Sequence, residues 1–168
     1  MIKQLLLLGL LNESDMHGYK LNEYVNQAMG MHTDIKKSTI YYTLENLGKD
    51  GYVEQQVERE GRRPERRVYK ITGKGKTYFL ELLRRHLSDY TRTYYSDDIG
   101  IAFMHHLPSD EVRRLLTEKR EKIQSILKHF REQPKKDENQ RYVVSHNIAH
   151  LEADLAWTYN ILMELHPK

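Results

Sequence analysis

The sequence contains no cysteine, which excludes disulfide bonds and thiolate metal sites and is typical of proteins kept in a reducing compartment. Long apolar runs are also absent, because the longest, at Leu5–Leu11, is far below the roughly 20 residues of a membrane-spanning helix. Glu13 and Asp15 follow that run without a small-residue cleavage site, so we expect no signal peptide. These absences predict a cytoplasmic protein without a membrane segment.

Patterns typical of catalytic sites are missing as well. The chain has no cysteine nucleophile, glycine-rich phosphate loop, nucleophile-elbow serine or HExxH zinc motif. We therefore expect neither an enzyme nor a cofactor. His146 and His150 have the spacing of four that can bind a divalent metal on a helix, but no acidic partner accompanies them. A solvated or hydrogen-bonded histidine pair is the preferred interpretation, and no metal is expected.

Charge of one sign is scarce overall, since the formal net charge is only +3, but the charges are unevenly distributed. Residues 36–76 contain eleven Lys and Arg against six Asp and Glu, a net charge of +5. Residues 1–35 have a net charge of −2 and residues 77–168 are balanced. The positive charge is therefore gathered on one segment, as a surface that contacts phosphate groups requires.

That basic segment combines an amphipathic helix with a hairpin. Ser38 is expected to cap the helix and Gly51 to end it in a left-handed conformation. Its apolar stripe consists of Ile40, Leu44 and Leu47. Residues 52–59 and 66–71 alternate as strands do, and the residues between them include Gly61 and Pro64, so they are expected to form a two-stranded hairpin.

A helix followed by a basic hairpin is the layout of a winged helix-turn-helix, in which the helix enters the major groove of DNA and the hairpin lies on the backbone. The helix N-terminus, at Lys36, Lys37 and Ser38, is expected to hold a phosphate. Base or sugar contacts are expected from its polar face, at Thr39, Tyr42, Thr43 and Asn46. The hairpin offers arginines, which suit phosphates and narrow minor grooves, at Arg59, Arg62, Arg63, Arg66 and Arg67.

Alternatively, the hairpin is a solvated turn of mixed charge without a DNA contact, since Glu58, Glu60 and Glu65 lower the net positive charge that the arginines give it. The adjacent polar helix face makes DNA contact the preferred interpretation.

Helical patterns fill most of the remaining chain. Before the basic segment, helices are expected over Ile2–Leu11 and from a cap at Asp15 to about Met29. After it, helices are expected from a cap at Thr72 to about Tyr95, over residues 96–107, and from a cap at Ser109. The apolar seam of that last helix is expected at Val112, Leu116, Ile123, Ile126 and Phe130.

The final predicted helix, residues 140–165, carries a heptad pattern that includes Thr158. The pattern could be core within one chain. We expect much of it to lie between two chains, because a single winged module rarely binds a specific operator well alone. The residues assigned to dimerisation are Val144, Ile148, Leu151, Leu155, Leu162 and Leu165.

Aromatic residues are abundant, with twelve tyrosines and one tryptophan. Each is individually more often a core residue than a ligand contact. Together they favour a cavity between the helix after the hairpin and the C-terminal helices, where a small aromatic effector could bind. The candidate lining residues are His86, Tyr90, Tyr94 and Trp157.

Four sequence pieces in order resemble the PadR-type transcriptional regulators. They are LLLLGLL from Leu5, HGYKL from His17, STIYYTLENLGKDGYV from Ser38, and VYKITGKG from Val68, with the arginine-rich hairpin before the last. LPSDEVRRLL and LEADLAWTYNILMEL resemble the helical extension of the longer members.

The resemblance implies a homodimeric winged-helix repressor on an inverted-repeat DNA operator. It also implies that Tyr19, Tyr41 and Tyr69 lie at the DNA-facing side or just behind it, although for Tyr41 packing beside the buried stripe competes. The family pattern has proline where this chain has Tyr42. Members often respond to small aromatic compounds and control detoxifying decarboxylases and efflux pumps.

Taken together, the chain is predicted to be mainly α. A winged helix-turn-helix with a two-stranded wing is expected at 1–80, and an α-helical, coiled-coil-like dimerisation domain at 81–168. The expected function is sequence-specific DNA binding by a homodimeric repressor of a detoxification, efflux or stress gene, released by a small aromatic ligand. The alternative is a winged-helix module that binds another protein and not DNA, which a weak salt dependence of binding would reveal.

Overall fold

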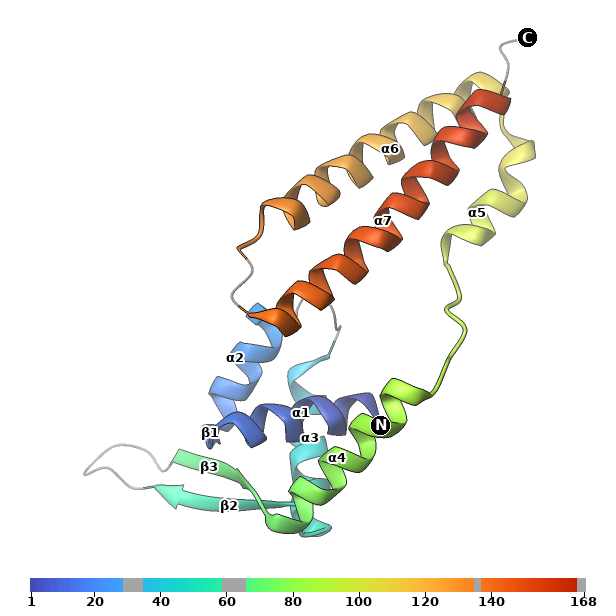
Figure 1. Cartoon of the computed structure of the whole chain (residues 1–168). Coiled ribbons are helices and arrows are strands. Elements are labelled where there is room, and N and C mark those ends of the chain that lie inside the picture. Colours follow the sequence, from blue (N-terminus) through green and yellow to red (C-terminus); the bar gives the residue numbers. More distant parts are fainter. Residues whose placement is uncertain (29–34, 59–65, 135–136, 166–168) are drawn as a thin grey trace. The chain divides into compact units, whose positions relative to one another are not determined.

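The computed structural model describes residues 1–28, 35–58, 66–134 and 137–165 (Figure 1). Its chain divides into two compact units, Met1–Arg92 and Thr93–Lys168. The predicted domain boundary after residue 80 falls inside a helix of the first unit. The unit extends further because that helix packs along the N-terminal helix and contributes Leu82 to the core.

The described residues of the first unit, called here the winged unit, form four helices and three short strands (Figure 1). In chain order these are α1 (Ile2–Glu13), β1 (Met16–His17), α2 (Gly18–Ala28), α3 (Lys37–Lys49), β2 (Val53–Glu58), β3 (Arg66–Ile71) and α4 (Gly73–Ser88). The predicted end of the second helix near Met29 lies outside the described residues.

A third strand completes the predicted hairpin. The sheet is antiparallel with the order β1-β3-β2, and β1 pairs Met16 with Tyr69. Asp15 therefore does not cap α2, as the sequence predicted; its carboxylate lies 3.0 Å from the Lys70 ammonium group. A two-residue strand has no alternation of its own, so the sequence could not reveal it.

The core of the winged unit forms where α1 meets the other helices and the sheet. The predicted stripe of α3 is confirmed, because Ile40, Leu44 and Leu47 are fully buried. Around it lie leucines of α1 and residues of the neighbouring elements: Leu7, Leu8, Leu11, Leu21, Val25, Val53, Tyr69 and Leu82. This core holds α3 by one face and leaves the other exposed.

Two of the three residues predicted to cap α3 or α4 or to end α3 have the predicted role. Gly51 has a φ of +73°, as the predicted left-handed turn requires. The Thr72 hydroxyl accepts a hydrogen bond from the Gly75 amide at 2.9 Å, so the predicted cap of α4 is confirmed. Ser38 is not a cap, because α3 begins one residue earlier, at Lys37, with Lys36 in the cap position.

The α4 helix ends at Ser88, before the predicted Tyr95. Residues 84–100 are all exposed, so beyond Leu82 and Leu83 no buried contact supports further turns.

The second unit, called here the helical unit, contains α5 (Asp97–Phe103), the 3-10 helix η1 (Met104–His106), α6 (Ser109–Glu132) and α7 (Glu138–Glu164). The α6 and α7 helices pack along one another (Figure 1). Asp137 caps α7 by accepting a hydrogen bond from the Gln140 amide at 2.8 Å. Ser109 is the first residue of α6 and not its cap; Pro108 occupies the cap position.

The seam of α6 differs from the predicted one at a single position. Leu127 is buried, whereas Ile126 is 47% exposed. From Ile123 the buried face continues by steps of four and three to Leu127 and Phe130, which keeps it in line with the 3.6-residue repeat. Both 126 and 127 are apolar, so periodicity alone did not separate them.

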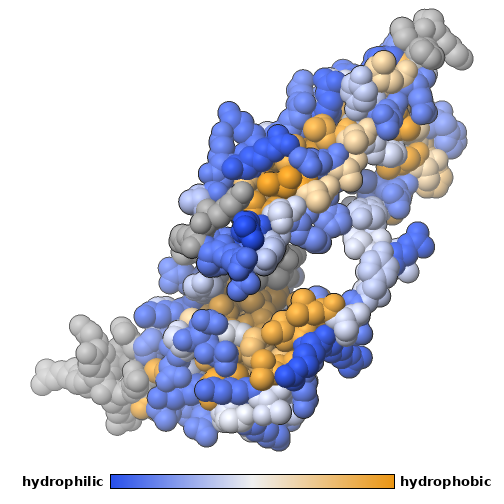
Figure 2. All heavy atoms as spheres, viewed as in Figure 1, coloured by the Kyte–Doolittle hydropathy of each residue, from blue (hydrophilic) through white to orange (hydrophobic). Residues whose placement is uncertain are grey.

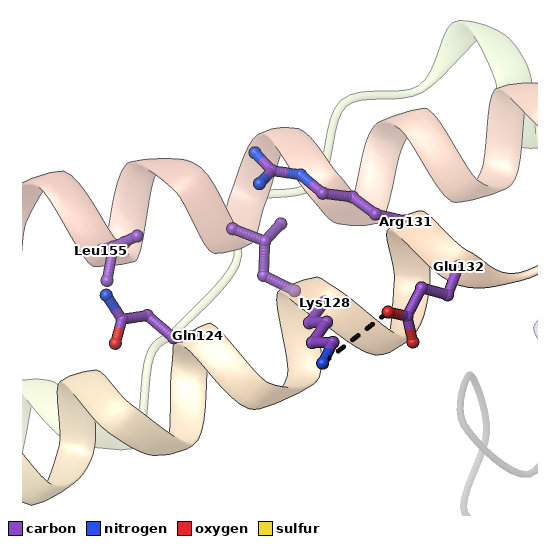
Figure 3. Close-up of a pocket in the computed structure, with 6 residues that line it drawn as sticks. Gln124, Lys128, Arg131, Glu132 and Leu155 are labelled. Atoms are coloured by element: carbon purple, nitrogen blue, oxygen red, sulfur yellow. Dashed lines mark ion pairs between the residues drawn. The ribbon is translucent and has the colours of Figure 1, made fainter.

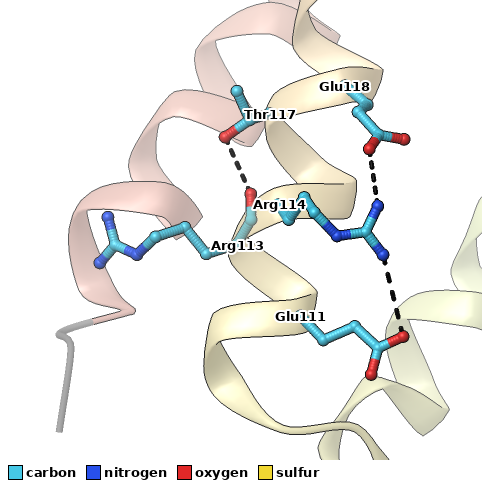
Figure 4. A network of polar contacts seen from close by, with 5 residues as sticks. All are labelled: Glu111, Arg113, Arg114, Thr117 and Glu118. Atoms are coloured by element: carbon cyan, nitrogen blue, oxygen red, sulfur yellow. Dashed lines mark hydrogen bonds and ion pairs between the residues drawn. The ribbon is translucent and has the colours of Figure 1, made fainter.

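Charged pairs line the outer face of α6. The Arg114 guanidinium lies 2.7 Å from the Glu118 carboxylate and 4.0 Å from that of Glu111, and the Thr117 hydroxyl donates to the Arg113 carbonyl (Figure 4). These exposed pairs contribute only a few tenths of a kcal/mol each to helix stability. No helix in the described part of the chain is long and apolar enough to cross a membrane.

Candidate nucleic-acid interface

The face of α3 opposite the core presents a continuous stripe to solvent. Ser38, Tyr42, Glu45 and Lys49 follow one another at helical spacings of four, three and four, and all are exposed. Tyr42 is 67% exposed, as its predicted DNA-facing role requires. We call these four residues the α3 stripe.

Other predicted contacts lie at the edges of the α3 stripe or at its start. Lys36 and Lys37 are exposed at the N-terminus of α3, which is also the positive end of the helix dipole. Thr39 and Asn46 are half-buried on its flank. These positions leave their predicted phosphate and base contacts sterically open.

Thr43 lies on the core side of α3, contrary to the prediction that it contacts DNA. It is 8% exposed, and its hydroxyl donates a hydrogen bond to the Thr39 carbonyl at 2.7 Å. Its hydroxyl is thus satisfied within the helix. The polar residue type suggested a DNA contact, but its angular position next to Leu44 and Leu47 places it against the core.

Glu45 and Lys49 were missed by the sequence analysis. Their carboxylate and ammonium groups are 2.7 Å apart, with side chains 64% and 67% exposed, respectively. The hydrogen bond from Lys49, and then its charge, lower the pKa of Glu45, and the same contacts raise the pKa of Lys49. The missed signal was spacing, since both residues continue the line from Ser38 to Tyr42.

Two tyrosines join α3 to the sheet. A Cβ atom on Gly18, the first residue of α2, would lie 2.8 Å from Tyr41 Cε1 and 3.1 Å from Tyr69 Cε2, so glycine is needed for this close approach. Burial raises the pKa of Tyr69, while the nearby positive charge of Arg67 opposes the rise. Tyr69 is therefore a buried support behind α3, and Tyr41 is half-buried beside it.

Tyr19 is exposed at the start of α2. Its ring stacks on that of His17 with centroids 5.5 Å apart. A DNA contact by Tyr19 stays a prediction that its position allows.

Of the wing, the structure describes the two paired strands, β2 and β3, and not the residues between them. The β2–β3 pairing runs from Val53 opposite Ile71 to Glu58 opposite Arg66, and Arg67 is exposed. The predicted phosphate contacts at Arg59, Arg62 and Arg63 lie outside the described residues. Nothing in the structure therefore tests those three positions.

The predicted dimerisation residues lie on the face of α7 that packs on α6. Val144 and Leu162 are buried, with Thr158 between them, and Ile148, Leu151, Leu155 and Leu165 are half-buried. Much of this stripe is thus used within one chain, and its role between chains stays a prediction. The large apolar side chains of α7 that remain exposed are Tyr142, Val143, Tyr159 and Met163.

The predicted effector residues do not converge within either unit. His86 and Tyr90 belong to the winged unit, and Tyr90 is 91% exposed; Tyr94 and Trp157 belong to the helical unit, and Tyr94 is 87% exposed. Trp157 is half-buried, with the Lys119 ammonium group 5.6 Å from its ring centroid.

Cavities of the helical unit are lined by other residues. One of about 560 Å³ lies between α5 and α6, where Ile101, Met104 and Leu116 line its apolar wall. Lys119, in an ion pair with Asp97, adds a charged group to that wall. A second, of about 450 Å³, lies along α6 and α7 beside Gln124, Lys128, Arg131, Glu132 and Leu155 (Figure 3).

The two histidines of α7 lie close together. The Nε2 atoms of His146 and His150 are 3.2 Å apart, and both residues are exposed. Across the described residues, no group of three or more histidine, cysteine or carboxylate side chains is placed to hold a metal.

The sequence of the winged unit is similar to that of known transcriptional regulators. The family model described as "Transcriptional regulator PadR-like family" matches residues 7–81. The negative transcriptional regulator PadR of Bacillus subtilis is 30% identical over 80 residues, which cover 48% of this chain and 44% of that protein. The match thus spans less than half of that curated relative's length.

Solved structures extend the likeness in fold to the whole chain. Bacillus subtilis PadR in complex with operator DNA has a TM-score of 0.84 at 20% identity, covering 99% of this chain and 100% of that one. The same protein in complex with p-coumaric acid has a TM-score of 0.82 at 19% identity, covering 98% and 99%. At these identities the likeness establishes the fold, with both the wing and the C-terminal helices.

Proposed function

Because the PadR-like family model of transcriptional regulators matches residues 7–81, we propose that this chain is a regulator of that family, which binds promoter DNA in the cytoplasm as a sequence-specific, homodimeric repressor. Its target would be a detoxification, efflux or stress gene. The observation that carries the proposal is the α3 stripe, a solvent-facing row of polar and charged side chains on a helix held from behind by the core.

The surroundings of the α3 stripe support DNA as the partner. Lys36 and Lys37 stand at its N-terminal end, and Arg67 stands on the adjacent sheet. Positive groups on both sides of a polar helix face suit a duplex, in which phosphates flank the major groove. The Bacillus subtilis protein, which shares this fold, has been solved in complex with operator DNA, and this supports DNA as the partner.

A homodimer would present two copies of α3 to an inverted-repeat operator. Exposed apolar side chains of the helical unit, among them Ile99, Phe103, Tyr159 and Met163, offer surface that a second chain could cover. We propose these outer surfaces as contacts in addition to the heptad stripe, because α6 already covers part of that stripe.

Release by a small aromatic ligand is the remaining part of the proposal. The cavity between α5 and α6 has an apolar wall, which suits an aromatic ring, and an aromatic acid could place its carboxylate on Lys119 in place of Asp97, the residue that pairs with Lys119 and also lines the wall. The complex of the Bacillus subtilis protein with p-coumaric acid supports that ligand class. Such a ligand would cause release only if it bound the DNA-free form more tightly than the DNA-bound form.

Footprinting the purified protein on the DNA upstream of its own gene tests the proposal. A protected site with dyad symmetry is expected, and protection is expected to disappear when an aromatic acid is added. Absence of protection at low salt, together with binding that hardly depends on salt, would favour the protein-binding alternative.

The wing arginines provide a second arm of that test. Replacing Arg62 and Arg63 with alanine is expected to weaken binding to all sequences and to reduce the salt slope by about 2, or about 1 for each phosphate that an arginine no longer neutralises. The matched control is the double substitution Arg84→Ala with Arg85→Ala, which removes two exposed guanidinium groups from α4. Equal effects of the two double variants would contradict the proposed role of the wing.

A further inference from the structure

The α3 stripe contains one feature that phosphate contact does not explain, the ion pair of Glu45 and Lys49. It lies in the C-terminal half of the stripe and is exposed at both partners. A carboxylate facing DNA repels the phosphates, so Glu45 lowers general affinity for DNA. An exposed pair of this spacing also contributes little to folding. Neither the stability of α3 nor backbone contact therefore accounts for its position.

Base edges offer the pair a matching counterpart. In the major groove a C·G pair presents the cytosine N4 donor next to the guanine O6 acceptor. These two atoms are about 2.9 Å apart, because the Watson–Crick hydrogen bond joins them. The Glu45 oxygen and the Lys49 nitrogen are 2.7 Å apart and have the opposite roles of acceptor and donor. The ion pair can thus meet both atoms of one base pair without separating.

Resting on the proposed function, we infer that Glu45 and Lys49 together read one C·G base pair in each half of the operator. Glu45 accepts from cytosine N4, and Lys49 donates to guanine O6 and N7. The reversed pair, G·C, places guanine O6 and N7 against the carboxylate. An A·T pair keeps a donor beside an acceptor, but adenine N7 then faces Glu45 and the thymine methyl group faces Lys49. The order of preference is therefore C·G, then A·T, then the two reversed pairs.

The ionisation of the pair agrees with this role. Lys49 lowers the pKa of Glu45, and Glu45 raises that of Lys49, so both groups carry full charge at neutral pH. The helix that carries them is held by Ile40, Leu44 and Leu47 in the core, so the backbone beneath the pair is fixed.

Fluorescence anisotropy with the full-length protein tests the inference. The footprinted operator is used as the probe, and each base pair is replaced in turn by the other three. Wild type is expected to lose affinity roughly tenfold to a hundredfold when one particular C·G pair in each half-site is reversed. Glu45→Ala is expected to reduce that discrimination several-fold, because only Lys49 then distinguishes the two orientations, and to bind the reversed operator more tightly than wild type does, because no carboxylate then faces guanine.

Two further variants sharpen the result. Glu45→Gln is expected to move the preference at that position from C·G to A·T, since an amide can both donate to N7 and accept from N6 of adenine. Glu81→Ala, which removes an exposed carboxylate from α4, is the matched control and should leave every preference unchanged. Circular dichroism is expected to show unaltered folding for Glu45→Ala, Glu45→Gln and Glu81→Ala.

The two possible failures are distinguishable. If wild type discriminates among operator variants but Glu45→Ala and Glu45→Gln keep the same preferences, the base assignment is overturned and the proposed function stands. If wild type binds all duplexes equally, the proposed function fails and the inference fails with it.

Discussion

The winged unit and the helical unit differ in how completely they bury their apolar side chains. In the winged unit, Leu7, Leu8 and Leu11 of α1 are buried in a core to which α2, α3, α4 and the sheet also contribute, and Leu8 is 0% exposed. Among the described residues of the helical unit, the buried ones lie along α6 and α7, which pack on one another, whereas α5 and η1 bury no residue. Hydrophobic residues nevertheless reach the surface of both units (Figure 2).

The difference suggests different sources of stability for the two units: buried contacts within the chain for the winged unit, and contacts with a further surface for the helical unit. A core to which α1, α2, α3, α4 and the sheet all contribute buried side chains can stabilise the winged unit from within and keep α3 in a fixed position, although Leu80 and Leu87 of α4 remain exposed. A two-helix seam with exposed Ile99, Phe103, Tyr142 and Met163 leaves apolar surface available for another surface to cover. This supports the proposal that the helical unit is where two chains meet.

The largest expected effect separates the two units directly. Leu8→Ala is expected to lower the free energy of unfolding of the winged unit by about 2–5 kcal/mol, because it leaves a cavity in a closed core. Met163→Ala, at a residue that is 61% exposed, should change the stability of the isolated chain by no more than about 0.5 kcal/mol. It should nevertheless weaken self-association.

Urea unfolding and sedimentation velocity check both substitutions. Trp157, the sole tryptophan, lies in α7, so its fluorescence reports on the helical unit while circular dichroism reports on all helices. Equal losses of stability from the two substitutions would contradict the distinction between a closed core and an open seam.

A smaller effect is expected at the first turn of α4, where two glycines form a matched pair. A Cβ atom on Gly75 would lie 2.1 Å from the Tyr52 carbonyl oxygen, so Gly75→Ala must displace backbone and is expected to cost at least about 1–3 kcal/mol. A Cβ atom on Gly73 would meet no atom within 4 Å, so Gly73→Ala should be neutral or stabilising by up to about 1 kcal/mol. Thermal unfolding measures both, and a similar melting temperature for the two variants would show that α4 packs on the winged core less tightly than described.

The smallest effects are expected at the two helix caps. Thr72→Ala should cost about 1–2 kcal/mol, because its hydroxyl caps α4 and also donates to the Gly51 carbonyl at 2.8 Å. Asp137→Ala, which removes only the cap of α7, should cost about 0.5–1 kcal/mol. Amide hydrogen exchange should localise each loss to its own unit. Loss of protection spreading from Thr72→Ala into α6 and α7 would show that the units unfold together.

Local features of the fold were predictable wherever a few neighbouring residues decide the outcome. The stripe of α3, the left-handed Gly51 and the Thr72 cap all depend on spacing or on one backbone conformation. Ser38 and Ser109 were wrong as caps, because each lies just inside its helix and either of two neighbouring positions would satisfy the same pattern.

The candidate site was predictable in place but not in detail. The sequence indicated α3 and its polar face, and Tyr42 and the two N-terminal lysines are exposed as expected. Thr43 was assigned by its polarity and proved to face the core, while Glu45, which continues the line from Ser38 to Tyr42, was missed. Side-chain chemistry suggested the contacts, and angular position on the helix decides which of them are available.

The sequence by itself determined which segments are helical, which face of each is apolar and where the positive charge gathers, since these follow from patterns over a few residues. Only the tertiary structure decided which partner each apolar face takes. The heptad stripe of α7 packs on α6 of the same chain, and β1 pairs with β3 from far along the sequence. A row of leucines and valines is equally favourable against any complementary surface, because the hydrophobic effect has no direction.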